Sequence, residues 1–425
     1  MLGRQSVEAL GFYGLLTLIV TMGQALLTLG GTIVLSQRGG QPSRHVELVQ
    51  IRGGLLIAVV GGSGAALAID LPTGLSPQRL ILLLAVTSLW ANAQVVQIAR
   101  LRLGYATAMQ TLATLFQLVL LGVALVLVPK LSGAALRDLI YVSYVLPLSA
   151  VGLWHLRQTV LRRRETTGAA TGGLGAVIAS AYVLIAVSLL FESAERVVAL
   201  TADDALRTLG LYFACYQVAS IIRKFPNIVG QAFLPGFGYL RHGQLQADLH
   251  ISAARMLGIW GFASGTLLGV LAVSLDDRIG GSFASVGATV AVLAVAFGAT
   301  AAVPLDGSLL TASGGIRRYQ VALGMGLLMF LPLAFTQSLL AIGATRAAAM
   351  VALSVACLVL MAQVKTARYV ELASALVGGL VCVAVSSELG LVVGMAAWAV
   401  ATTGFVALIR SSIGSTLLTT PFSTQ

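Results

Sequence analysis

Charged residues are scarce in this sequence. Only 10% of the 425 residues are charged, whereas 58% are hydrophobic, and the mean hydropathy is +0.94. A water-soluble domain of this size could not carry such a composition without aggregating. The composition therefore excludes soluble enzymes and soluble binding proteins, and it predicts a chain that crosses a membrane several times.

The few reactive residues are not grouped as an enzyme or a metal site would require. Cys215, Cys357 and Cys382 lie in separate apolar runs, which favours neither a disulfide framework nor a metal site. The four histidines show no catalytic spacing, and the adjacent acids are Asp203-Asp204 and Asp276-Asp277, each in a short connection. The sequence has no Walker motif and no glycine-rich phosphate loop. We therefore expect neither enzyme activity nor a cofactor or metal.

The apolar runs are long, which predicts membrane-spanning helices rather than the short alternating strands of a barrel. The expected fold is therefore all-α. Breaks that contain Arg, Lys, Pro or Gly divide the chain into thirteen expected spans, at residues 10–35, 53–69, 80–98, 106–128, 134–156, 172–191, 207–240, 251–274, 283–313, 319–342, 345–363, 370–386 and 389–409.

Positive charge is distributed unevenly over the connections between these spans. Sixteen of the 26 Lys and Arg residues fall on one side of the membrane with four of the 15 acids, and eight fall on the other side with ten acids. The side rich in Lys and Arg is expected to face the cytoplasm, which places the C-terminus there and the N-terminus outside. The net charge of +11 then reflects topology, with anionic lipid headgroups as its partner, and no nucleic-acid partner is expected.

Particular ionisable residues are assigned to connections in this scheme. Glu195, Arg196 and Arg346 fall in short outer connections, and Arg255 and Glu371 fall in cytoplasmic ones. These assignments serve the count of charge on each side, and Arg255, Arg346 and Glu371 stand within the first five residues of the expected spans 251–274, 345–363 and 370–386.

The longest polar break, residues 157–171, contains Arg162-Arg163-Arg164-Glu165 and is expected to be a basic cytoplasmic linker. It separates an N-terminal bundle, residues 1–156, from a C-terminal bundle, residues 172–363. Residues 364–425 would form two additional helices and a short tail. Every other connection is short, so no large domain outside the membrane is expected.

A short element occurs twice in the chain. Leu10-Gly11-Phe12-Tyr13 recurs as Leu209-Gly210-Leu211-Tyr212, each time at the outer entrance of a long span. The spans that follow keep the same order and orientation, which is typical of two parallel repeats. The second lobe has a span, residues 172–191, before its copy, whereas the first lobe has no corresponding span. We therefore expect that a first helix is missing from this sequence, and that fourteen spans would complete the pattern.

Several further segments resemble a known family, namely Glu195-Arg196, Leu209-Gly210-Leu211-Tyr212-Phe213-Ala214, Phe225-Pro226, Leu234-Pro235, Leu309-Leu310-Thr311-Ala312-Ser313-Gly314-Gly315, Ile342-Gly343-Ala344 and Ala347-Ala348. With these residues the chain resembles the polysaccharide-unit flippases (O-antigen, exopolysaccharide and teichoic-acid-unit exporters) of the multidrug/oligosaccharidyl-lipid/polysaccharide exporter superfamily. The resemblance covers about residues 10–410.

This resemblance implies a fold and a function. The expected fold has two pseudo-symmetric six-helix bundles around a central cavity, with two further C-terminal helices. The expected activity moves an undecaprenyl-pyrophosphate-linked oligosaccharide from the inner to the outer leaflet of the bacterial inner membrane by alternating access. A polysaccharide polymerase and glycosyltransferases would be the partner enzymes.

Arg223 and Lys224 are adjacent cations inside the apolar stretch from Leu209 to Leu240. A cation at membrane depth costs about 3 to more than 10 kcal/mol, so it usually faces a hydrated cavity or a partner. Cations on a cavity wall would neutralise a pyrophosphate. Because successive residues cannot share one helix face, Arg223 is the expected contact and Lys224 the bystander. In the alternative, the span ends near Ile222 and both side chains reach the headgroups.

Four more residues are candidates for the same site. Asp306 could pair with Arg223, bind a coupling proton or cation, or lie in a short re-entrant segment at the cytoplasmic interface. Pro226 and Pro235 could kink their helix for gating or serve packing alone. Gln217 could contact sugar hydroxyls or hydrogen-bond to a neighbouring helix.

A second transport hypothesis is a cation-coupled multidrug or small-metabolite exporter of the same fold. Such an exporter would need cavity acids to attract organic cations, whereas Arg223 and Lys224 are basic. Moving negative charge outward down an inside-negative potential gains about 2.3 kcal/mol per charge per 100 mV, so an anionic lipid could be driven without ATP. The flippase is therefore the preferred hypothesis.

Overall fold

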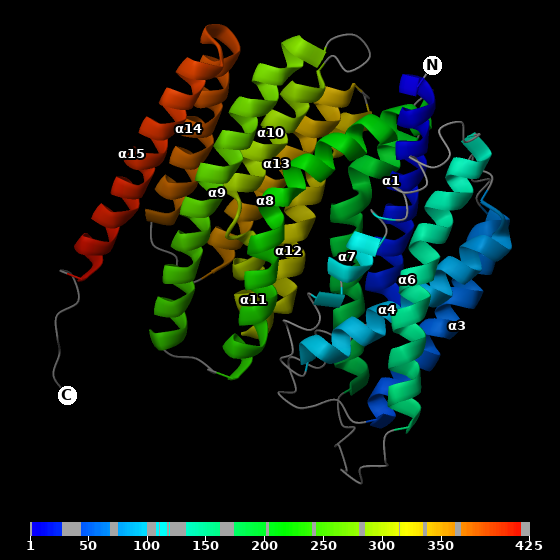
Figure 1. Cartoon of the computed structure of the whole chain (residues 1–425). Helices are drawn as coiled ribbons and strands as arrows, with labels where there is room; N and C mark the ends of the chain where they lie inside the picture. Colours follow the sequence, from blue (N-terminus) through cyan, green and yellow to red (C-terminus); the bar gives the residue numbers. More distant parts are fainter. Residues whose placement is uncertain are drawn as a thin grey trace, which may run out of the picture. The chain divides into compact units, whose positions relative to one another are not determined.

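The computed structural model describes residues 2–27, 44–68, 75–99, 133–161, 174–200, 204–239, 244–279, 285–313, 315–334, 338–361 and 367–417, together with a few residues between 108 and 119. The described part of the chain contains helices and no strand (Figure 1), which confirms the all-α prediction. Its elements are α1 (Leu2–Leu27), α3 (Arg44–Ala68), α4 (Pro77–Ala99), α6 (Gly133–Leu161), α7 (Leu174–Leu200), α8 (Ala205–Tyr239), α9 (Gln244–Ile279), α10 (Val286–Ala299), α11 (Val303–Ala312), α12 (Ile316–Leu328), the 3-10 helix η2 (Leu331–Ala334), α13 (Leu339–Leu360), α14 (Ala367–Leu389) and α15 (Leu391–Leu417).

Eight of these helices are long and apolar enough to cross a membrane, and a bent pair of helices makes a ninth candidate. The protein is therefore a multi-pass membrane protein. Most of the predicted span 106–128 and residues 162–171 of the predicted linker lie outside the described residues. The start of that linker, residues 157–161, forms the last turn of α6.

The structure corrects several predicted boundaries. Helix α7 continues to Leu200, so Glu195 and Arg196 lie inside a helix and are buried rather than in an outer connection. The predicted span 319–342 is wrong as one helix, because α12 ends at Leu328 and α13 begins at Leu339. Arg346 consequently lies in α13 with its side chain fully buried. Apolar content alone does not reveal that Glu195 and Arg346 form an ion pair in the folded protein.

The chain divides into two compact units. Unit 1 comprises residues 1–193 and 204–210, and unit 2 comprises residues 194–203 and 211–425. The division falls within α7 and at the start of α8, so both helices contribute to both units.

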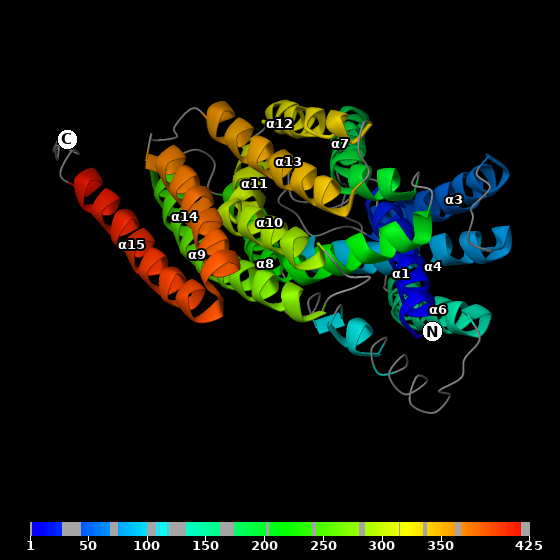
Figure 2. The ribbon, with the colours of Figure 1, turned by 90° about the horizontal axis from the view of Figure 1, so that it is seen from above.

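In unit 1, α4 packs against α1, α3 and α6 (Figure 2). Its core contains the buried side chains of Phe12, Leu16, Leu83, Trp90 and Tyr144. These residues come from α1, α4 and α6, so one continuous apolar cluster holds the three helices together.

The two copies of the repeated element meet in unit 1. A methyl group added to Gly11 of α1 would collide with the carbonyl oxygen of Leu206, and one added to Gly210 of α8 would collide with that of Val7. Each carbonyl belongs to the residue four positions before the other glycine, so the contact is reciprocal. Small residues of this kind allow membrane helices to approach at backbone distance.

In unit 2, α9 and α10 are also joined through glycines. A methyl group on Gly261 or Gly298 would collide with the carbonyl oxygen of the other residue, and one on Gly265 would lie 2.5 Å from that of Ala294. Because three glycines share this crossing, the relative position of α9 and α10 is tightly constrained.

The two C-terminal helices pack on α9 and belong to unit 2 (Figures 1 and 2). The indole nitrogen of Trp398 in α15 donates to the carbonyl oxygen of Ala263, 2.9 Å away. The hydroxyl groups of Ser274 in α9 and Ser386 in α14 are 2.8 Å apart. Polar contacts at these points supplement the apolar packing, so α14 and α15 are integrated into this unit.

The predicted span 283–313 is broken. Helices α10 and α11 meet at an angle of 43°, across the turn formed by residues 300–302. Pro304 follows at the start of α11, where its missing N–H costs no helical hydrogen bond. The break places Asp306 in the first turn of a separate short helix.

Candidate functional site

One face of α8 carries the residues that surround Arg223. Tyr212, Tyr216 and Arg223 are spaced by four and seven residues, which places them on the same side of the helix. The rings of Tyr212 and Tyr216 are 6.1 Å apart, and both side chains are buried. Arg223 therefore follows an aromatic stripe that points into unit 2.

The guanidinium group of Arg223 contacts two aromatic residues. Its Nη1 donates a hydrogen bond to the hydroxyl oxygen of Tyr216 at 3.3 Å, and its Cζ lies 5.1 Å from the ring centre of Phe297 in α10. The rings of Tyr216 and Phe297 pack edge to face at 5.7 Å. The positive charge thus faces π-electron density that stabilises a cation without neutralising it, and the side chain remains partly exposed.

A second guanidinium approaches the same tyrosine. The Cζ atom of Arg196 in α7 lies 4.5 Å from the ring centre of Tyr216. Tyr216 therefore contacts Arg196 through its ring and Arg223 through its hydroxyl group. This arrangement brings two arginines from two helices together around one aromatic side chain.

Phe297, which Arg223 contacts, shows where Arg223 lies along the length of the α10–α11 pair. Phe297 is eleven residues after Val286 and fifteen residues before Ala312. At a rise of about 1.5 Å per residue, these separations correspond to roughly 16 and 22 Å. Helix α8 itself continues past Arg223 to Tyr239, and its residues 205–234 are apolar enough to cross a membrane.

The other predicted residues of α8 lie in different surroundings. Lys224 is exposed, Gln217 is partly buried, and Pro226 is buried. Helix α8 continues through both Pro226 and Pro235 without ending at either. The structure therefore brings Arg223, rather than Lys224, among the aromatic residues of unit 2.

A buried ion pair joins α7 to α13. Oε2 of Glu195 in α7 lies 3.7 Å from Nη1 of Arg346 in α13, and both side chains are fully buried. Because an isolated buried charge is very unfavourable, each group offsets the desolvation of the other.

Asp306 lies in a different cluster. Its Oδ1 is 2.8 Å from Nε2 of His250 in α9, and its Oδ2 is 3.6 Å from Nη2 of Arg368 in α14. These two residues, rather than Arg223, are its ion-pair partners in the described part of the chain. Asp306 is fully buried.

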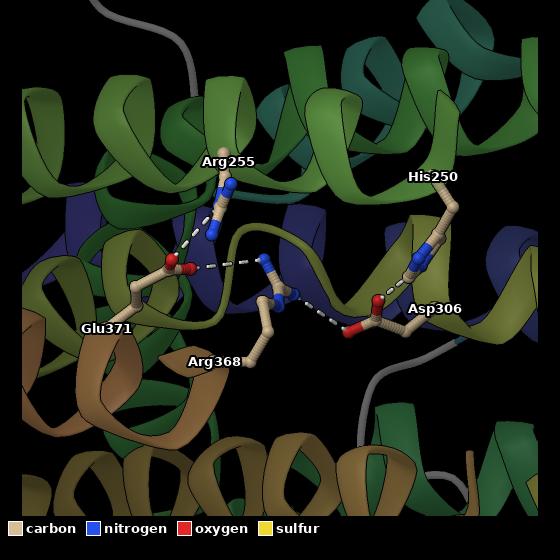
Figure 3. A network of polar contacts seen from close by, with 5 residues as sticks. All are labelled: His250, Arg255, Asp306, Arg368 and Glu371. Atoms are coloured by element: carbon tan, nitrogen blue, oxygen red, sulfur yellow. Dashed lines mark hydrogen bonds and ion pairs between the residues drawn. The ribbon is translucent and has the colours of Figure 1, made fainter. Parts of the chain in front are cut away.

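The cluster continues from Arg368 back to α9. Arg368 Nη1 lies 3.7 Å from Oε2 of Glu371, and Arg255 Nε lies 3.2 Å from Glu371 Oε1 (Figure 3). Arg255 and Glu371 are buried, which corrects their assignment to solvated cytoplasmic connections. Together His250, Asp306, Arg368, Glu371 and Arg255 form a continuous row of polar contacts, called the ion chain below.

Sequence reasoning missed the ion chain because its members are distant in sequence. His250 and Asp306 are separated by 56 residues, and Arg255 and Glu371 by 116. The one available signal was that Asp306, His250 and Arg255 lie in or beside apolar runs, where a charge needs a partner. Among the described residues, no group of three or more His, Cys, Asp or Glu is placed to hold a metal ion.

Comparison with solved structures identifies the fold. The chain matches a MOP superfamily transporter from Pyrococcus furiosus, described as having a binding pocket of reverse polarity that suggests a different function, with a TM-score of 0.60 and 13% identity over 91% of this chain and 90% of that chain. It matches the lipid II flippase MurJ in an inward closed conformation with a TM-score of 0.59 and 9% identity over 96% of each chain.

A third match is an outward-facing multidrug resistance transporter of the MATE family, with a TM-score of 0.55 and 12% identity over 90% of this chain and 88% of that chain. No family model and no curated protein sequence matches the chain. At these identities the likeness concerns the fold alone. The protein is a multi-pass membrane protein with the fold of the MOP superfamily transporters.

Proposed function

We propose that this protein is a transporter that flips a polyprenyl-pyrophosphate-linked oligosaccharide across the bacterial inner membrane by alternating access, for the assembly of a surface polysaccharide. The observation that carries this proposal is the position of Arg223. Its guanidinium is partly buried, lies near the middle of the α10–α11 pair, and contacts aromatic rings. A cation in such a position is suited to an anionic cargo.

The chemistry of arginine fits the pyrophosphate group of this cargo. A guanidinium can form two parallel hydrogen bonds to phosphate oxygens, and it is less strongly hydrated than a lysine ammonium group. A guanidinium carries five N–H groups, one of which donates to the hydroxyl oxygen of Tyr216. Gln217, on the next position after Tyr216, is a candidate contact for sugar hydroxyls.

The membrane potential supplies a driving force in this proposal. Each negative charge that moves outward across an inside-negative membrane gains about 2.3 kcal/mol per 100 mV. Glycosyltransferases would build the lipid-linked unit on the cytoplasmic side, and a polysaccharide polymerase would extend it on the other side. The C-terminus lies in the cytoplasm in this orientation.

A cation-coupled exporter of drugs or small metabolites is the second candidate, supported by the likeness of the fold to a MATE transporter. The two candidates differ in the charge that the cargo carries. Arg196 and Arg223 around Tyr216 favour an anion over an organic cation.

The experiment uses vesicles that contain the purified full chain and a fluorescent polyprenyl-pyrophosphate oligosaccharide. A membrane-impermeant reductant quenches label on the outer leaflet, so the rate of quenching reports flipping. Arg223→Ala should slow flipping by about ten-fold or more, because it removes hydrogen bonds to a charged group, and Arg223→Lys should retain part of the rate. Lys224→Ala, at the exposed neighbouring position, is the matched control and should flip normally.

Flipping by folded Arg223→Ala at the wild-type rate would contradict the proposal. The same vesicles loaded with a fluorescent organic cation test the second candidate. Uptake of that cation driven by a proton or sodium gradient, without flipping of the pyrophosphate lipid, would establish the exporter instead.

A further inference from the structure

The ion chain begins and ends on the same helix. His250 and Arg255 are both in α9, while Asp306 comes from α11 and Arg368 and Glu371 come from α14 (Figure 3). The contacts therefore run from α9 to α11, on to α14, and back to α9. Three helices are joined in a closed loop by side chains of which none is more than 12% exposed.

The charges of the ion chain balance. Arg255 and Arg368 carry two positive charges, Asp306 and Glu371 carry two negative charges, and Nε2 of His250 shares a hydrogen bond with Asp306. A balanced buried cluster leaves no surplus charge to attract a ligand. Because buried ion pairs are weak contributors to stability but specify particular geometries, a role in holding helices in one arrangement fits this cluster better.

The helix that the ion chain holds is the short piece beyond the break. Before the break, α10 is fixed to α9 by the reciprocal glycine contact of Gly261 and Gly298. Beyond it, α11 has only ten residues; Leu305 packs in an apolar cluster with residues of α8 and α9, and Asp306 adds polar contacts to α9 and α14. Glycine packing therefore fixes α10 to α9, whereas α11 is held by apolar packing together with polar contacts that can exchange partners.

Helix α11 also contacts the helix that carries Arg223. The hydroxyl group of Ser308 donates to the carbonyl oxygen of Gly230 in α8 at 2.8 Å, and a methyl group on Gly230 would lie 2.8 Å from the carbonyl oxygen of Pro304. Gly230 is seven residues, or about two helical turns, after Arg223. Any change in the direction of α11 would therefore press on α8 close to Arg223.

We propose that the ion chain is a clamp that sets the bend between α10 and α11 by tying α11, through Asp306 and Arg368, to α14 and α9. With the clamp closed, α11 packs against α8 at Gly230. Loss of the link between Asp306 and Arg368 frees α11 to turn at residues 300–302. The clamp acts within unit 2 and does not depend on the nature of the cargo.

Cys357 provides a native reporter for this movement. It is fully buried in α13, which packs against α10 and α11. Replacing Cys215 and Cys382 by alanine leaves Cys357 as the sole thiol of the chain. Its rate of reaction with N-ethylmaleimide then measures how often this region opens.

Two double variants are matched in charge and differ in the link they remove. Asp306→Asn with Arg368→Gln removes one positive and one negative charge and breaks the ion pair between α11 and α14. Arg255→Gln with Glu371→Gln removes the same charges but keeps the contact between Asp306 and Arg368. We expect the first pair to raise the labelling rate of Cys357 by about ten-fold or more, and the second to change it by less than about two-fold.

Equal labelling of the two double variants, at the wild-type rate or above it, would overturn the clamp. If the first pair does not purify as a monodisperse protein, Arg368→Lys replaces it, because lysine keeps the charge but cannot span both carboxylates in the same way. Faster labelling of folded Arg368→Lys than of Arg317→Glu, an exposed change in α12, supports the clamp, and equal labelling overturns it.

Discussion

Gly11 and Gly210 occupy equivalent positions in the two copies of the repeated element, and each makes room for a backbone carbonyl of the helix that carries the other. Val7 and Leu206, which supply these carbonyls, are themselves equivalent, four residues before each glycine. The crossing is therefore symmetric at the level of single atoms. The repeated element thus makes the same contact on both sides of the crossing between α1 and the start of α8.

Substitution of either glycine tests this crossing. We expect Gly11→Ala and Gly210→Ala each to lower the free energy of unfolding by about 1–3 kcal/mol, because a side chain forces the backbones apart. The double variant should cost less than the sum of the two, since both residues share one contact. Thermal unfolding of the purified protein in detergent measures each effect. Gly258→Ala is the control, because no atom lies within 4 Å of the added group, and a loss as large as that of Gly11→Ala would contradict the explanation.

The sequence predicted the helical architecture because long apolar runs admit few other structures in a membrane. It failed where a charge is neutralised by a residue far away in the chain. Arg346 was assigned to the connection between the expected spans 319–342 and 345–363, yet it is buried and Glu195 lies 3.7 Å from it in the folded protein. The pairing of His250 with Asp306 was missed for the same reason. Periodicity and composition report on local structure, whereas these pairs are created by tertiary packing.

Arg223 could be selected from the sequence, but its surroundings could not. Its position within a long apolar run identified it as a costly charge. The hydrogen bond to Tyr216 follows from helical spacing and is in principle visible in the sequence, whereas Phe297 and Arg196 come from other helices. The side chains that decide what Arg223 can bind are thus a product of the fold.

Tyr216 should act as a positioning residue for Arg223. Tyr216→Phe removes the hydroxyl oxygen that accepts from Arg223 but keeps the ring that faces Arg196 and Phe297. Loss of this hydrogen bond is worth about 1 kcal/mol, which corresponds to a roughly five-fold higher half-saturating concentration of the pyrophosphate lipid in the flipping assay. The thermal unfolding temperature should change little. Tyr212→Phe is the comparison, because the hydroxyl group of Tyr212 has no hydrogen bond to Arg223, and an equal effect of both changes would argue against positioning.

The orientation of the chain can be tested with reporter fusions. Lys and Arg are concentrated on the side that is expected to face the cytoplasm, which places Gln425 inside and Asp277 outside. A fluorescent protein that matures only in the cytoplasm should therefore be fluorescent after Gln425, and alkaline phosphatase, which is active only outside, should be active after Asp277. In the control fusions the two reporters are exchanged, and the fluorescent protein after Asp277 and alkaline phosphatase after Gln425 should both be inactive. Alkaline phosphatase activity at Gln425 would show that the predicted orientation is inverted.

Removing one partner of the buried pair Glu195 and Arg346 should cost far more stability than removing one partner of an exposed pair of the same chemistry. Both side chains are fully buried, whereas those of Arg79 and Asp138 in unit 1 are 45% and 54% exposed. Glu195→Gln or Arg346→Gln alone leaves one buried charge without its counter-charge, at a cost of about 3–5 kcal/mol. Arg79→Gln should cost less than about 1 kcal/mol, because water screens the exposed pair.

The double variant Glu195→Gln with Arg346→Gln separates pairing from packing. Removing both charges removes the desolvation cost together with the attraction, so the double variant should be more stable than either single variant. Thermal unfolding in detergent at one salt concentration compares all four proteins. Additive losses in the double variant would mean that the two residues do not act as a pair, and that each is held by other contacts.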